Sequence, residues 1–192
     1  MTATSPAVLT GEKTRLRPIE EGDNALLVCW YNDPEVRHWL HLSEAPEETL
    51  ESQRERLQRF QSDPARRNWI IETLAGEPVG NVSLIGIDEA HGRAELGVSI
   101  GAKAFWGRGL GTDAIRRVLR HAFTELALRR VWLITDADNR RAIRCYEKCG
   151  FTREGVLRSH RLRYGQPLDM VVMGALAEEC AAEPGGVKSK HG

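Results

Sequence analysis

The sequence predicts an α/β protein with a mixed, mostly antiparallel sheet of about seven strands and helices on both faces of the sheet. Three observations predict this class. Residues 68–100 contain three runs of β-type periodicity separated by short turns, which is typical of a meander. Residues 111–128 repeat apolar side chains every three or four positions, as an amphipathic helix does. Residues 130–137 form an almost continuous apolar run, which indicates a strand covered on both faces.

The predicted elements follow one another as a strand, two helices, three strands, a helix, a strand, a helix and two closing strands. The first helix is expected to end near Asp33 and Pro34, and the last to have Asp138 or Asn139 as its N-cap and to end at Gly150. The predicted ranges are 13–19, 24–33, 46–63, 68–75, 77–87, 93–100, 111–128, 130–137, 138–150 and 151–176, the last range holding both closing strands.

Length and composition indicate one globular domain. The chain has 192 residues, of which 41% are hydrophobic and 28% charged, and its formal net charge is zero. No apolar run approaches the roughly 18 residues of a membrane span, and the N-terminus lacks the features of a signal peptide. We therefore expect a cytoplasmic protein that binds neither membranes nor nucleic acid. The predicted organisation is an N-terminal arm at 1–12, a domain at 13–176 and a flexible C-terminal tail at 177–192.

Two further compositional features bear on function. The four cysteines have neither the spacing of a zinc site nor that of a disulfide framework, so we expect reduced thiols and no metal. Residues 20–55 hold ten acidic residues against two basic ones, whereas residues 101–150 hold eleven basic residues against five acidic ones. Solvated helix faces alone explain such a distribution. It gains a functional meaning if the basic part meets an anion and the acidic part a cation.

The stretch "FWGRGLGTDA" at residues 105–114 places three glycines on alternate positions just before a predicted helix. Glycine tolerates positive φ and lets a ligand approach the backbone, and the free N–H groups of a helix N-terminus favour an anion, commonly phosphate. The spacing is not G-x-G-x-x-G and contains no Gly-Lys-Ser/Thr, which excludes a dinucleotide-binding loop and a Walker A loop. A different phosphate-bearing ligand is expected.

The segment "DNRRAIRCYEKCGF" at residues 138–151 narrows the choice. Together with "WGRGLG", it resembles the GNAT superfamily of acetyl-coenzyme A N-acetyltransferases, whose loop signature is R/Q-x-x-G-x-G/A. Trp106 stands where that signature has Arg or Gln. The wording resembles the branch of ribosomal-protein N-terminal and polyamine acetyltransferases. The resemblance covers residues 13–176 in element order, is most specific at 95–151, and implies the GNAT (acyl-CoA N-acyltransferase) fold with acetyl-CoA as cosubstrate.

The resemblance also implies a set of coenzyme-binding residues. In this family the glycine loop binds the pyrophosphate, and the strand that here reads "LGVSI" parts from its neighbour and hydrogen-bonds the pantetheine arm. Arg108, Arg140 and Arg144 are expected to supply positive charge, and Asn139 to contact the pantetheine chain. The full expected set is Val98, Ser99, Ile100, Trp106, Gly107, Arg108, Gly109, Leu110, Gly111, Thr112, Asn139, Arg140, Ala142, Arg144 and Tyr146.

Two catalytic residues are implied in the same way. Tyr146 occupies the family position of the general acid, and a phenol with a pKa near 10 is able to protonate a thiolate leaving group. A tyrosine that only packs on an amphipathic helix is the alternative. Glu95 occupies a position where many members carry the carboxylate that draws a proton from the amine. A solvated glutamate is the alternative there, and His91 is a second candidate for the base.

For the acceptor the sequence predicts only a chemical class, and it also predicts an oligomeric state. The resemblance places the first two helices beside the acceptor, so the acidic residues Glu35, Glu44, Glu47 and Glu48 are expected to favour a cationic amine, either a polyamine or a protein N-terminus. An aminoglycoside acetyltransferase and a non-catalytic acyl-CoA-binding module are the alternatives. The closing segment "LDMVVMGAL", residues 168–176, is expected to form an apolar sheet edge, and a homodimer is predicted to cover it.

Overall fold

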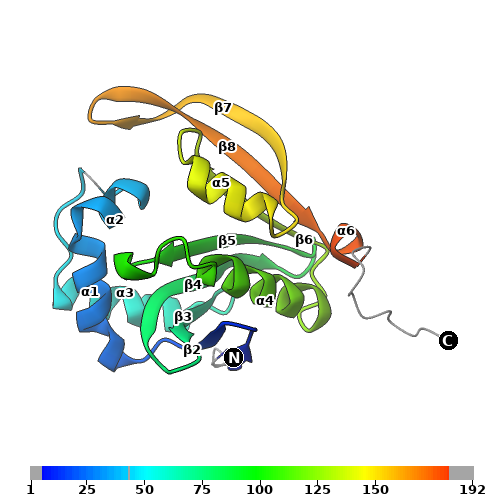
Figure 1. The fold of residues 1–192 in the computed structure, drawn as a ribbon, viewed down its shortest axis with the longest axis horizontal. Coiled ribbons are helices and arrows are strands. Elements are labelled where there is room, and N and C mark those ends of the chain that lie inside the picture. Colours follow the sequence, from blue (N-terminus) through cyan, green and yellow to red (C-terminus); the bar gives the residue numbers. More distant parts are fainter. Residues whose placement is uncertain (1–5, 43, 182–192) are drawn as a thin grey trace.

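A computed structural model describes residues 6–42 and 44–181 (Figure 1). Within these residues one sheet of eight strands has the order β1-β2-β3-β4-β5-β6-β8-β7, and every neighbouring pair is antiparallel except β5 and β6. The mixed, mostly antiparallel sheet is confirmed, with one strand more than expected. The strands are β1 (Leu9–Thr10), β2 (Thr14–Pro18), β3 (Arg67–Thr73), β4 (Pro78–Asp88), β5 (Arg93–Ile100), β6 (Arg130–Asp136), β7 (Thr152–Arg163) and β8 (Gln166–Leu176).

Helices cover both faces of the sheet, as predicted. Side chains of β3 alternate between the two faces: Trp69 and Ile71 belong to the core beneath α4, whereas Ile70 packs on Leu27 and Trp30 of α1. No helix in the described part of the chain is long and apolar enough to span a membrane. The helices are α1 (Asn24–Asn32), α2 (Pro34–Trp39), α3 (Leu50–Ser62), α4 (Leu110–Thr124), α5 (Arg140–Glu147) and α6 (Ala177–Ala181), with short 3-10 turns at Glu21–Asp23 and Lys103–Phe105.

The N-terminal half differs from the prediction at three places. β1 pairs with β2 and lies within the arm predicted at 1–12, of which residues 1–5 are outside the described part. α1 ends near Asp33 as predicted, but a second helix, α2, starts at once. The Asp33 carboxylate accepts hydrogen bonds from the backbone of the next turn, and Pro34 occupies its first position, so the same two residues end one helix and begin another. α3 begins at Leu50 rather than at residue 46.

The C-terminal half corrects the predicted sheet edge. β8, which holds residues 168–176, lies inside the sheet between β6 and β7, with Met170 and Met173 buried. β7 is the edge strand, and most of its side chains are exposed. The predicted tail begins as the helix α6, and residues 182–192 lie outside the described residues. The expected N-cap of α5 is confirmed, because the Asn139 side chain accepts a hydrogen bond from the backbone N–H of Ala142 at 3.1 Å.

β5 and β6 separate soon after they meet. They are paired at only three positions, which end with Glu95 opposite Trp132. Beyond this point β5 remains paired with β4 on its other side, and β6 with β8. The facing edges of the two strands therefore have backbone N–H and C=O groups that are not used in a common ladder.

Asp113, in the first turn of α4, fixes this helix to the turn between β1 and β2. Its carboxylate accepts hydrogen bonds from the backbone N–H groups of Glu12, Lys13 and Thr14 at 3.0, 3.1 and 2.9 Å, and from the Thr14 hydroxyl at 2.6 Å. Gly11 makes room for it, because a Cβ at that position would lie 2.3 Å from a carboxylate oxygen. Residues near the N-terminus of the domain thus position the start of α4.

We expect Asp113→Asn to lower the free energy of unfolding by about 2 kcal/mol, because hydrogen bonds to a charged acceptor are worth roughly 1.5–3 kcal/mol. The amide nitrogen would also face N–H donors. Urea denaturation measures the change, with Glu89→Gln on the exposed β4–β5 turn as the matched control. A loss within about 0.5 kcal/mol of the control, the usual size of a surface effect, would contradict this role.

Candidate active site

A cavity of about 500 Å³ lies where β5 and β6 part. Its walls are formed by residues 95–100 of β5, the glycine loop and start of α4, and the inner side of α5. Figure 1 shows β5 and α5 on opposite sides of this space, with α2 at one end. Another part of the wall comes from α2, which contributes Val36 and Trp39, and from the two residues that follow it, Leu40 and His41.

The structure brings most of the predicted coenzyme-binding residues to this cavity. Arg108 and Arg140 do not line it; the Arg108 guanidinium lies instead 4.9 Å from the centre of the Phe105 ring. The other predicted residues line the wall: Val98, Ser99, Ile100, Trp106, Gly107, Gly109, Leu110, Gly111, Thr112, Asn139, Ala142, Arg144 and Tyr146.

Trp106 anchors the glycine loop at the position where the family signature has Arg or Gln. Its indole N–H donates a hydrogen bond to the Ile100 carbonyl at 2.7 Å, which fixes the loop to the end of β5. The guanidinium of Arg141 stacks 4.0 Å over the same indole ring. Arg141 and Arg144 line the cavity and Arg140 does not, whereas Arg140 and Arg144 were expected to. The side of α5 on which each arginine lies decides this, and the sequence of the segment did not reveal it.

The glycine loop ends in a helix N-terminus that faces the cavity. Gly107 and Gly109 have φ of 76° and 81°, and Gly109 is the N-cap of α4. The first N–H groups of this helix have no intrahelical acceptor and carry partial positive charge. Lys13 adds a full charge that the sequence did not reveal, since its Nζ lies 3.4 Å from the position a Cβ on Gly109 would take. The arrangement is suited to an anion.

Tyr146 lies on α5 with its side chain at the cavity wall. Its ring packs edge-on to Phe151, with 5.9 Å between ring centres. Burial raises the pKa of the phenol above its usual value near 10, so the group keeps its proton at neutral pH. A protonated hydroxyl in the wall is able to donate a proton to a leaving group.

Glu95 lies at the last paired position between β5 and β6, in the cavity wall. Burial raises the pKa of its carboxyl above the usual value, and the nearby Arg66 guanidinium offsets part of that rise. Among the described residues, its carboxylate takes part in no hydrogen bond or ion pair, which leaves it open to a ligand. His91 is not brought to the site: its side chain is 67% exposed and pairs with Asp88 in a turn.

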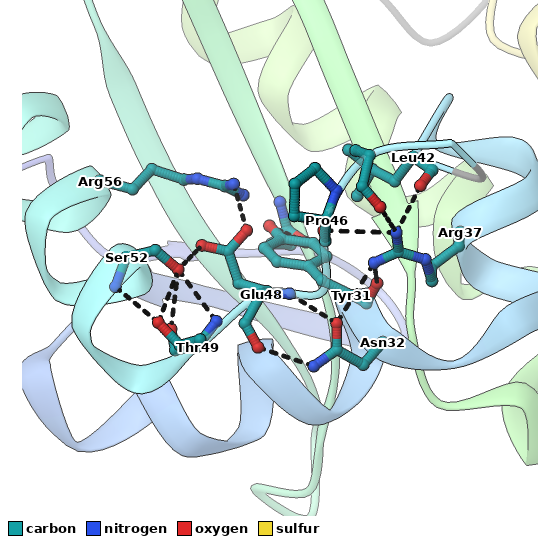
Figure 2. Close-up of polar contacts among 11 residues, drawn as sticks. Tyr31, Asn32, Arg37, Leu42, Pro46, Glu48, Thr49, Ser52 and Arg56 are labelled. Atoms are coloured by element: carbon teal, nitrogen blue, oxygen red, sulfur yellow. Dashed lines mark hydrogen bonds and ion pairs between the residues drawn. The ribbon is translucent and has the colours of Figure 1, made fainter.

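The segment after α2 is held by one buried guanidinium (Figure 2). Arg37 donates hydrogen bonds to five oxygens and has no carboxylate partner within the described residues; the five are Tyr31 O, Asn32 Oδ1, Leu42 O, Ala45 O and Pro46 O. Asn32 adds a reciprocal pair, donating to Glu48 O and accepting from Glu48 N, both at 2.8 Å. These contacts position Leu40 and His41 at the cavity mouth.

The acidic residues expected around the acceptor do not line the main cavity. Glu35 pairs with Lys103 at 2.6 Å, and Glu48 pairs with Arg56 and accepts a hydrogen bond from Ser52. Glu44 lines a smaller adjoining cavity of about 400 Å³, and Glu47 is exposed. Glu95 is the carboxylate that the described part of the main wall presents. The acidic composition of residues 20–55 thus largely serves local pairing and solvation.

The parted strands, the glycine loop and the tyrosine on α5 define a protein class. Residues 13–152 match the family described as "Acetyltransferase (GNAT) domain". The chain belongs to this family and is a GNAT N-acetyltransferase.

Particular relatives refine this position within the family. The chain is 30% identical over 175 residues to spermidine N(1)-acetyltransferase of Escherichia coli, covering 91% of each chain. It is 30% identical to the putative ribosomal N-acetyltransferase YdaF of Bacillus subtilis, covering 79% of this chain and 84% of the relative. The crystal structure of spermidine N-acetyltransferase from Vibrio cholerae in complex with CoA and spermine superposes with a TM-score of 0.80 at 29% identity, covering 87% and 97% of the two chains. The protein is thus related to polyamine acetyltransferases.

Proposed function

We propose that the protein transfers an acetyl group from acetyl-coenzyme A to a primary amine of a cationic acceptor, either a polyamine or a protein N-terminus. The observation that carries the proposal is the cavity where β5 and β6 part. A loop suited to an anion, a protonated phenol and an unpaired carboxylate all line this one cavity. The Vibrio cholerae enzyme, bound to CoA and spermine, supports both substrates by analogy. The location expected from the sequence is the cytoplasm.

The coenzyme's phosphates are assigned to the glycine loop. The free N–H groups at the start of α4 would bind the pyrophosphate, with Arg141, Arg144, Lys148 and Lys13 supplying charge. The unpaired edge of β5 has backbone groups for the amides of the pantetheine arm. The thioester would then lie toward Tyr146 and Glu95.

The proton transfers in this scheme use Glu95 and Tyr146, whose pKa values are both raised by burial. Glu95 takes a proton from the acceptor nitrogen, and a raised pKa makes its carboxylate a stronger base. Tyr146 donates a proton to the departing thiolate, whose conjugate thiol has a pKa of roughly 8.5. No metal is needed for either step.

The experiment that tests the proposed function is a screen of amine acceptors with release of the coenzyme thiol as readout. Spermidine, spermine, short peptides with free N-termini and aminoglycosides represent the acceptor classes. Thiol release with a polyamine or a peptide is the expected result. Coenzyme binding without thiol release on any amine would instead indicate a binding module.

Coenzyme A at about 100 times its Kd should raise Tm by roughly 5–10 °C, because such binding contributes about 2.7 kcal/mol. Gly109→Glu and Gly111→Glu should abolish the shift, since each places a carboxylate among the phosphate-binding N–H groups. Gly22→Glu is the matched control, because a side chain there meets nothing within 4 Å. Unchanged coenzyme affinity in both loop variants would refute the assignment of the loop.

Tyr146→Phe should reduce kcat/KM by roughly 10²-fold, the usual contribution of one positioned general acid. Only a hydroxyl is lost, so the fold and coenzyme binding should persist. Tyr164→Phe, at a 62% exposed position, is the matched control. Glu95→Gln tests the other transfer through its pH dependence.

Glu95 acts as a base only when ionised, so wild-type kcat/KM should fall as the pH falls through its raised pKa. Glu95→Gln should lose activity mainly above that pKa and approach the wild type below it. Profiles of kcat/KM against pH for both proteins check the sign. Full activity of Tyr146→Phe would contradict its role as the general acid. Parallel profiles of kcat/KM against pH for the wild type and Glu95→Gln would contradict the role of Glu95 as the base.

We also propose a homodimer that pairs through β7. This edge strand carries exposed apolar side chains, with Val156 and Leu162 at 55% and 59% exposure, and an open row of backbone groups. Light scattering at micromolar concentration should give twice the chain mass of 21.5 kDa. Gly155→Pro, which removes a backbone donor from β7, should shift the mass toward the monomer. A monomeric mass for the wild type, with and without coenzyme, would contradict the proposal.

A further inference from the structure

His41 lies just after α2, at the point where the main cavity meets the smaller one, and it lines both. Its Nε2 is 2.9 Å from Oδ1 of Asp136, and its side chain is 34% exposed. No sequence motif marked it, because its partner is nearly a hundred residues away. A histidine in the wall of an acetyl-transfer cavity is a group that the proton transfers described above leave unused.

Asp136 places a carboxylate beside this histidine. It is at the end of β6 and only 1% exposed, and its oxygen Oδ2 accepts a hydrogen bond from Arg163. Burial raises the pKa of this carboxyl, and the Arg163 charge offsets part of the rise. Its Oδ1 accepts no hydrogen bond from the described residues, so its contact with the imidazole is one of charge. A carboxylate at this distance stabilises the positive charge that an imidazole gains when it takes up a proton.

The backbone at His41 is held in an unfavourable conformation. Its φ is 66°, in the left-handed region that favours glycine. Such strain persists where surrounding contacts over-determine it, and it concentrates at functional sites. The contacts are on both sides of the residue: Asp136 binds the ring, and Arg37 binds the next carbonyl, that of Leu42, at 2.5 Å.

The proton balance of the proposed reaction calls for a second base. An acceptor that arrives as an ammonium ion has no lone pair, so one proton must leave before nitrogen attacks the thioester carbon. A second proton leaves that nitrogen as the C–N bond forms and the C–S bond breaks. The thiolate then takes a proton from Tyr146, and the proton held by Glu95 replaces it on the tyrosinate. In sum, an ammonium ion and a thioester give an amide, a thiol and one proton released to water.

We propose that His41 removes the first of these protons, with the Asp136 charge stabilising the imidazolium that forms, while Glu95 takes the second. This inference rests on the proposed function. The partial exposure of the imidazole provides the route by which the first proton reaches water. The charged and titratable groups around the pair are Arg161 and Arg163 on β7, His38 on α2, and Glu44 and His160 across the smaller cavity.

The test exploits the backbone of His41. His41→Gly removes the imidazole, suits the positive φ, and leaves a space that free imidazole can enter. The variant should keep the coenzyme-induced rise in Tm and lose roughly 10²-fold in kcat/KM at pH values where the acceptor is an ammonium ion. Added imidazole should restore activity, and the deficit should shrink above the pKa of the acceptor amine, which is then neutral without help.

His91→Gly is the matched control. His91 also pairs with a carboxylate, Asp88, at 2.8 Å, but it does not line the cavity, so its loss should change neither the rate nor the response to imidazole. Glu95→Gln should lose rate without rescue by imidazole.

Two outcomes would overturn the proposal. The first is a His41→Gly variant with undiminished kcat/KM, and the second is a loss equal at every pH and not rescued by imidazole, which would mark a structural role. Both leave the proposed function intact. A wild type that acetylates no amine would refute the proposed function itself.

Discussion

The site depends on the short parallel pairing of β5 and β6. Three residue pairs hold the strands together, and beyond Glu95 the two strands turn to their outer neighbours. Because both remain in the sheet, the gap has rigid walls that already carry hydrogen-bonding groups. The glycine loop follows β5 and α5 follows β6, so both binding segments are delivered to the same opening. Longer pairing would close the cavity between the two strands.

The sequence reveals the side of this opening to which we assign the coenzyme. The glycine loop, the capped helix at Asn139 and the positions of Tyr146 and Glu95 are all encoded within short segments with recognisable spacing. Element types were also readable, because amphipathic periods survive in α4 and in the β3–β5 meander. What remained hidden depends on contacts between distant segments. Lys13 reaches the loop through the β1–β2 turn, and His41 meets a carboxylate on β6.

Two departures from the prediction have separate physical causes. The pattern of β8 is apolar in either an edge or an interior strand, and periodicity carries no information on neighbour order; pairing with β6 places it inside. The acidic residues were expected beside the acceptor from their charge and from the resemblance, and they do not line the main cavity. Charge does not tell a ligand-facing carboxylate from one satisfied nearby, as Glu48 is by Arg56. Burial and partners make that distinction.

The link between Asp113 and the β1–β2 turn has a consequence for the newly made chain. The hydrogen bonds join residues about a hundred positions apart, and the three N–H donors emerge from the ribosome long before their acceptor. Until residue 113 is made, the three N–H groups have no carboxylate to bind, and Lys13 has no loop to approach. The contact between residues 12–14 and the start of α4 therefore forms only after more than half of the domain has been synthesised. The nascent chain completes this side of the candidate anion site late in its synthesis.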